Sequence, residues 1–142
     1  MAAKACTTAP FFLWASAKLP SLLSPADRKV VVDEIWRAQN ADGGWSLRSL
    51  GKWKPRPAVT LGSESDAYAT GLVAFALQQG ESRRTTPALA KALAWLRNNQ
   101  DPQSGSWPSQ SMNKIRDPNT HAGKFMRDAA TGYAVLALLA NQ

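Results

Sequence analysis

Cysteine and histidine are almost absent from this 142-residue chain, which contains one of each, Cys6 and His121. A single cysteine excludes an intramolecular disulfide, and neither residue has a partner at metal-ligand spacing. Apolar runs of membrane-spanning length are missing as well, because Lys18 interrupts the longest N-terminal stretch. The sequence therefore predicts no metal, no cofactor and no transmembrane segment.

Acidic residues are also scarce: 10 Asp and Glu stand against 17 Lys and Arg, which gives a net charge of +7. The segment 52–57 places Trp53 among basic residues, a pattern that also suits single-stranded nucleic acid. The basic residues are nevertheless dispersed over the chain, and no recognised nucleic-acid motif is present. We therefore expect no nucleic-acid partner. Loops that carry Arg116, Lys124 and Arg127 can instead attract an anionic molecule.

The chain does contain two glutamine–tryptophan segments, and several markers recur between them at one spacing. One segment ends in Gln100 and Trp107, and a looser copy ends in Gln39 and Trp45. The two tryptophans are separated by one position more than the two glutamines. The pair Thr70-Gly71 recurs as Thr131-Gly132, at the same separation as the glutamines. A common period for several markers predicts a repeat protein, in which neighbouring helical hairpins bury each other's apolar faces.

Hydrophobic periodicity, caps and helix breakers predict amphipathic helices and also inner helices, which other helices surround. Ser24 and Thr86, each followed by proline, are typical helix caps. The inner helices are apolar on nearly all sides, as helices surrounded by others should be. We expect five helices, at about Ala3–Lys18, Pro25–Gln39, Ser65–Gln79, Pro87–Gln100 and Phe125–Ala140, with inserted loops at 46–63 and 104–124.

The glutamine–tryptophan segments resemble the QW repeat of the terpenoid cyclase and prenyltransferase superfamily, most closely that of squalene-hopene cyclase-like proteins. The second copy shows the family's order of basic, small, aromatic and aliphatic residues before the Gln, Gly and Trp, namely Lys91, Ala92, Trp95, Leu96, Gln100, Gly105 and Trp107. In the first copy Val30 and Glu34 replace the small and the aromatic residue. The resemblance implies an all-α fold, an α/α toroid (a partial (α/α)6 barrel) of repeated helical hairpins around a central cavity.

We expect residues 1–142 to form a single partial toroid domain. Its repeat copies would cover about 3–62 and 63–123, and a last inner helix about 124–142. A full toroid of this family has about six hairpins. The resemblance therefore implies a C-terminal part of a squalene-hopene cyclase-like protein, whose partner is the rest of a larger toroid N-terminal to this chain. It implies no zinc site, because Lys4 stands where the prenyltransferases have Asp, two residues before Cys6.

Three carboxylates, Glu64, Asp66 and Asp128, are expected near the starts of inner helices. An acid in the first helical turn can simply satisfy free amide groups and complement the helix dipole. The segment 64–67 also resembles the Asp-x-Asp-Asp motif with which class II terpene cyclases protonate an alkene, with Ala67 in place of the last aspartate. That resemblance implies Asp66 as the proton donor and Glu64 as its acidic neighbour.

Aromatic residues on or beside the inner helices are candidates for substrate binding. A cyclase stabilises carbocations by cation–π attraction to aromatic faces. Tyr68, Phe75 and Tyr133 are the candidates, and Trp14 and Phe125 could add to them. The alternative is that these rings pack in the core, which is the commoner use of an aromatic residue at helical spacing.

Two functions stay open on this evidence. One is acid-initiated cyclisation of an isoprenoid, or of another hydrophobic small molecule, with basic loops that could attract a prenyl diphosphate. The other is a non-catalytic toroid module that binds a lipid, a peptide or a partner domain. Function depends on a site and not on a fold, and the incomplete acid motif favours the module.

Overall fold

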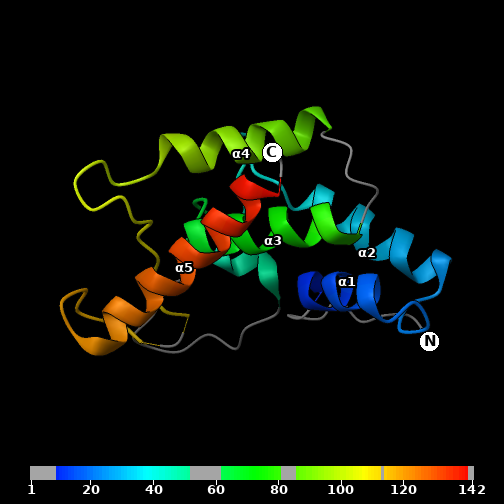
Figure 1. Cartoon of the computed structure of the whole chain (residues 1–142), viewed down its shortest axis with the longest axis horizontal. Helices are drawn as coiled ribbons and strands as arrows, with labels where there is room; N and C mark the ends of the chain where they lie inside the picture. Colours follow the sequence, from blue (N-terminus) through cyan, green and yellow to red (C-terminus); the bar gives the residue numbers. More distant parts are fainter. Residues whose placement is uncertain (1–8, 52–61, 81–85, 113, 141–142) are drawn as a thin grey trace.

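The computed structural model describes residues 9–51, 62–80, 86–112 and 114–140, and all regular structure in these ranges is helical (Figure 1). The predicted all-α class is therefore confirmed for this part of the chain. The basic segment 52–57 and residues 3–8 of the first predicted helix lie outside the described residues. The elements are α1 (Ala9–Lys18), α2 (Pro25–Arg37), the 3-10 turn η1 (Leu47–Leu50), α3 (Ala67–Gly80), α4 (Pro87–Asn98) and α5 (His121–Leu139).

Helices α2 and α4 begin where the sequence predicts. The Ser24 hydroxyl accepts a hydrogen bond from the Asp27 amide at 3.1 Å, and Thr86 accepts one from the Leu89 amide at 3.2 Å. Each cap is followed by a proline, whose missing N–H costs nothing in the first turn. Both predicted starts are confirmed.

Helix α5 begins at His121, before the predicted start at Phe125. The reason is Thr120, whose hydroxyl accepts a hydrogen bond from the Gly123 amide at 3.2 Å and caps the helix. Asp128 consequently lies inside α5 and not in its first turn. The expectation that Asp128 marks a helix start is wrong.

Smaller differences concern the turns around α3. This helix begins at Ala67, and Gly80, predicted to lie just beyond its end, is its last residue. The predicted loop 46–63 contains the short turn η1, which Ser46 caps by accepting a hydrogen bond from the Ser49 amide at 3.2 Å. A single 3-10 turn carries too little periodicity to be found from sequence.

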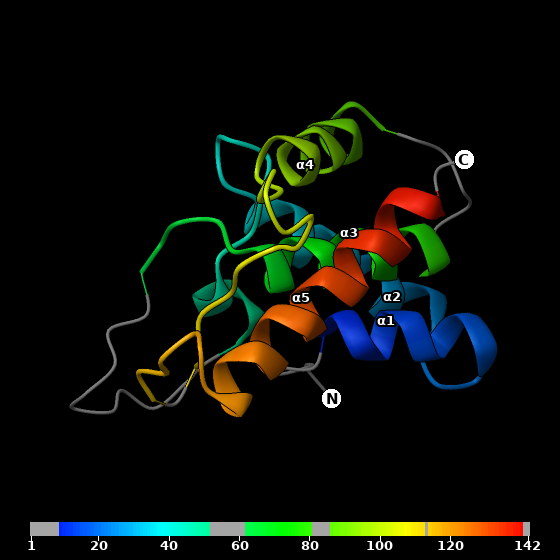
Figure 2. The same cartoon turned by 60° about the vertical axis from the view of Figure 1, so that its left-hand side comes forward.

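Helix α3 lies at the centre of the described structure. It packs against α1, α4 and α5, and α2 packs against α1 (Figures 1 and 2). Every residue from Ala69 to Gln78 is buried, which confirms the prediction that this helix is surrounded on all sides. The order α1, α3, α5 thus forms a row of neighbouring helices, with α3 covered on both sides.

The contact between α3 and α5 is close because Gly71 has no side chain. A Cβ atom at Gly71 would lie 2.7 Å from the Ala134 amide nitrogen and 2.9 Å from the Tyr133 carbonyl carbon. Opposite it, α5 presents the fully buried alanines Ala130, Ala134 and Ala137. Small residues on both helices therefore let their backbones approach each other.

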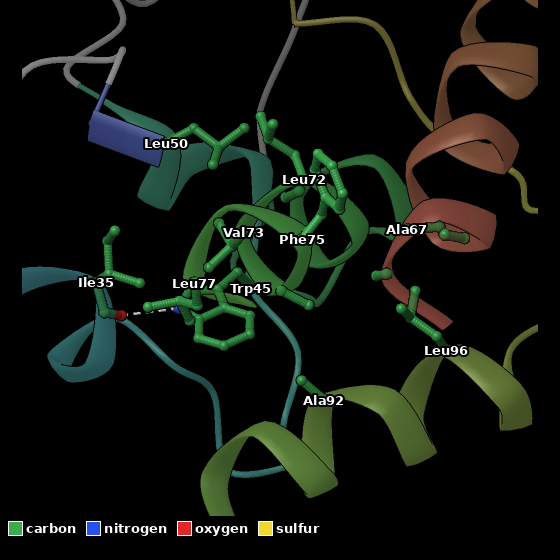
Figure 3. Close-up of a cluster of buried hydrophobic side chains, with 14 of the residues drawn as sticks. Ile35, Trp45, Leu50, Ala67, Leu72, Val73, Phe75, Leu77, Ala92 and Leu96 are labelled. Atoms are coloured by element: carbon green, nitrogen blue, oxygen red, sulfur yellow. Dashed lines mark hydrogen bonds between the residues drawn. The ribbon is translucent and has the colours of Figure 1, made fainter. Parts of the chain in front are cut away.

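The two glutamine–tryptophan segments make matching hydrogen bonds with their indoles. Trp45 donates its indole N–H to the Ile35 carbonyl at 2.8 Å (Figure 3), and Trp107 donates to the Leu96 carbonyl at 2.7 Å. Both rings are almost completely buried. Each indole thus adds a second donor to a carbonyl in the last turn of the preceding helix, which also accepts the amide of Ala38 or of Asn99.

Backbone and amide contacts match as well. The Trp45 and Trp107 amides donate to the hydroxyls of Thr70 and Thr131, both at 3.0 Å. The side-chain amides of the two glutamines donate to the carbonyl of a turn glycine: Gln39 to Gly43 at 2.8 Å, and Gln100 to Gly105 at 2.7 Å. The markers that recur in the sequence are therefore the groups that tie each turn to the following inner helix.

Candidate functional site

Asp66 lies directly before α3 and gathers hydrogen-bond donors from two parts of the chain. Its carboxylate accepts from the amides of Tyr68 at 2.8 Å and Ala69 at 3.2 Å, which is the geometry of a helix cap. From the second loop it accepts the Ser109 hydroxyl at 3.0 Å and the Gln110 amide at 3.3 Å. The hydrogen bonds of Asp66 therefore connect residues 109–110 of the second loop to the start of α3.

Burial raises the pKa of Asp66 above its ordinary value of 3.8, although the hydrogen bonds from Ala69, Ser109, Gln110 and Tyr68 act in the opposite direction. A raised pKa is what an acid catalyst needs. However, both carboxylate oxygens already accept hydrogen bonds from protein groups. The geometry is that of a satisfied structural carboxylate.

The other predicted acids are not brought to Asp66. Glu64 is exposed, and its carboxylate folds over Gly62, so that a Cβ there would clash with it. No hydrogen bond joins Glu64 to Asp66 within the described residues. Asp128 is exposed on α5, and its carboxylate lies 3.8 Å from the Arg127 guanidinium. A second acid beside Asp66, which the Asp-x-Asp-Asp resemblance implies, is not supplied by Glu64 or Asp128.

The predicted aromatic residues form two separate pairs. Tyr68 and Tyr133 meet edge to face with 5.5 Å between ring centroids. Phe75 meets Trp14 in the same manner at 5.3 Å, and it is buried in the core. Burial raises the pKa of both tyrosines, and Tyr133 and Asp66 raise that of Tyr68 further. Phe125 is exposed and belongs to neither pair.

A second carboxylate, Asp42, joins three elements. It accepts hydrogen bonds from the Ser65 hydroxyl at 2.7 Å, the Gly44 amide at 3.0 Å and the Trp95 indole at 3.0 Å. Burial opposes ionisation of Asp42, but these hydrogen bonds outweigh it and hold its pKa below the usual range. Asp42 thereby connects the first glutamine–tryptophan turn to α4 and to the segment before α3.

The free side of α5 carries an apolar surface. Val135, Leu136 and Leu139 are 40%, 44% and 56% exposed. A Cβ at Gly132, on the same helix, would meet no atom within 4 Å. We call these four residues the open face of α5. Exposed apolar residues that share one face of a helix make this face a candidate binding surface.

Sequence reasoning missed Ser109 and Gln110, which complete the environment of Asp66. They lie in a loop far along the chain from Asp66, and no local pattern links them to it. Sequence reasoning also missed the open face of α5, because apolar residues at helical spacing do not show which side of a helix another helix covers.

Comparisons with protein-family models, curated proteins and solved structures each gave no match. The family likeness thus rests on the residues of the glutamine–tryptophan segments alone. None of the described helices is long and apolar enough to cross a membrane. The described residues also contain no group of three or more His, Cys, Asp or Glu side chains suited to a metal ion.

Proposed function

We propose that this chain is a squalene cyclase/prenyltransferase-like module of an α/α toroid, and that its function is to bind an apolar helix of a partner domain on the open face of α5. The observation that carries the proposal is the contrast between two equivalent glycines. A Cβ at Gly71 of α3 would meet the backbone of α5, whereas a Cβ at Gly132, its counterpart at the repeat period, would meet no atom within 4 Å.

The repeat period supports this assignment because it relates α3 to α5 position by position. Ala74 and Gln78 of α3, which follow Gly71, are buried. Their counterparts at this period, Val135 and Leu139, are exposed. The row α1, α3, α5 therefore ends in a surface of the same kind as the one that α5 covers on α3.

The contact between α3 and α5 also indicates the chemistry of the partner. The covering helix α5 uses Ala130, Ala134 and Ala137, so that its backbone can approach Gly71. A helix that binds the open face needs small residues at the same spacing over Gly132. Its remaining contacts would be apolar, to match Val135 and Leu139.

The test uses a fluorescent peptide with the sequence of α5, since α5 is the helix that covers the equivalent face of α3. We expect saturable binding to the full chain, measured by anisotropy. Gly132→Leu should weaken it about tenfold or more, because the new side chain fills the place where a partner backbone would approach. Ala94→Leu adds the same side chain at an exposed position of α4 and should have no effect.

Equal binding to wild type and Gly132→Leu would refute the proposed surface, and so would the absence of binding. Sedimentation of the chain without peptide provides a second control. A dimer that Gly132→Leu dissociates would assign the open face to a second copy of this chain instead of a partner domain.

A second candidate function, acid-initiated cyclisation of an isoprenoid, is favoured by the raised pKa of Asp66. It predicts cyclised products, detected by mass spectrometry, when the chain is incubated with squalene or prenyl diphosphates. Asp66→Asn should abolish them. Tyr68, Phe75 and Tyr133 would then bind the substrate. The absence of product from the wild-type chain would exclude this activity for the chain.

A further inference from the structure

A separate cavity lies between the second loop and the N-terminal half of α5. Its volume is about 390 Å³, which is in the range of small-molecule sites. Ser109 and Gln110 line one part of it, and Met126 and Arg127 of α5 line another. Asp66 bonds to Ser109 and Gln110 but does not itself line the cavity.

The charged residues that line this cavity are all cationic: Lys114, Arg116 and Arg127. Among the described residues Lys114 and Arg116 make no ion pair. Arg127 lies 3.8 Å from Asp128 at the surface. Hydrogen bonds from Ser104 and Gln103 lower the pKa of Asp101, and the charge of Arg127 adds to this effect. Neither acid lines the cavity. Asp117 follows Arg116 in the chain but is not one of the lining residues. Because the lining residues include three cations and no acid, the potential in the cavity is positive and an anion placed there is favoured.

Apolar groups line the rest of the cavity. Ile115 stands between the two loop cations and is 82% exposed, an unusual degree for an isoleucine. Met126 and the prolines Pro108 and Pro118 add further apolar surface. Cationic and apolar groups therefore occur side by side in one cavity.

We infer that this cavity binds an amphiphilic anion, with its phosphate or carboxylate head at Lys114, Arg116 and Arg127 and its apolar chain along Ile115 and Met126. Lys114 and Arg116 are exposed and Arg127 is half-buried, and the charges of these three side chains together favour a multiply charged head group. The exposed Ile115 would be covered by the chain of the ligand. This site is independent of the open face of α5, and the two proposals can fail separately.

The test is isothermal titration calorimetry of the full chain with dodecyl phosphate, kept below its critical micelle concentration. We expect dodecyl phosphate to bind at least tenfold more tightly than either inorganic phosphate or dodecanol. Inorganic phosphate lacks the apolar chain, and dodecanol lacks the charged head group. Arg116→Gln should weaken binding about threefold, and Lys114→Gln combined with Arg116→Gln about tenfold. Ile115→Ser should weaken binding of dodecyl phosphate but leave that of inorganic phosphate unchanged.

Arg97→Gln is the matched control, because Arg97 is an exposed cation on α4 that does not line the cavity. It should bind like wild type. If Arg97→Gln weakens binding as much as Arg116→Gln, only the net charge matters and the cavity is refuted. Binding to phosphatidylcholine vesicles that contain phosphatidic acid, without binding of free dodecyl phosphate, would equally overturn it in favour of a membrane surface contact.

Discussion

One glycine of α3 and one of α5 provide a matched experiment on the arrangement of these two helices. Gly71→Ala and Gly132→Ala make the same chemical change, and each glycine follows the same two residues, Ala-Thr, in the sequence. In α3 the new Cβ would lie 2.7 Å from the Ala134 nitrogen and 3.1 Å from the Tyr133 Cβ. In α5 it would meet nothing within 4 Å.

The expected free energies follow from these distances. Replacing glycine by alanine inside a helix stabilises it by about 1 kcal/mol. Gly132→Ala should show this gain in full, since no atom is displaced. At Gly71 the new atom meets backbone that cannot rotate away, and overpacking of this kind costs about 1–3 kcal/mol. Gly71→Ala should therefore be destabilised by up to about 2 kcal/mol, and the two variants should differ by about 1–3 kcal/mol.

Urea denaturation followed by circular dichroism measures this difference. The midpoint should rise for Gly132→Ala and fall for Gly71→Ala, with unchanged slopes, because the surface exposed on unfolding is the same. Equal stabilisation of both variants would show that α3 and α5 are not in close contact at Gly71. Equal destabilisation would show that Gly132 is covered, and it would refute the open face of α5.

Three further predictions concern hydrogen bonds and pH. Trp45→Phe and Trp107→Phe should each lower the free energy of unfolding by about 1–2 kcal/mol, since each leaves a buried carbonyl without its indole donor. Urea denaturation measures this change, and an unchanged free energy of unfolding would contradict the two buried hydrogen bonds. The raised pKa of Asp66 means that the folded state holds the carboxyl proton more tightly than the unfolded state does. The free energy of unfolding of wild type, relative to that of Asp66→Asn, should therefore fall as the pH rises above 3.8. A relative stability that rises with pH would contradict the burial of Asp66. The lowered pKa of Asp42 predicts the opposite pH dependence: wild type should be more stable than Asp42→Asn, and this advantage should be lost as the pH falls below 3.8. Urea denaturation curves between about pH 2 and 7 test both pH predictions.

The candidate site shows where sequence reasoning succeeds and fails. The sequence predicts an acid, Asp66, at the start of a buried helix, and the structure places Asp66 directly before α3. Its partners Ser109 and Gln110 come from a loop beyond α4, which no local pattern predicts. Glu64 is close to Asp66 in the sequence but turns away over Gly62, because direction in a loop depends on backbone geometry and not on spacing.

The sequence by itself determined the features that depend on residues close together in the chain. The caps Ser24 and Thr86 act on amides three positions away, and the apolar character of α3 requires burial on all sides, so both could be found without a structure. Which face of an inner helix meets a neighbour was decided only by the tertiary structure. Gly71 and Gly132 stand in the same local sequence, yet one contacts a backbone and the other is open, because contact depends on the helix that packs beside it.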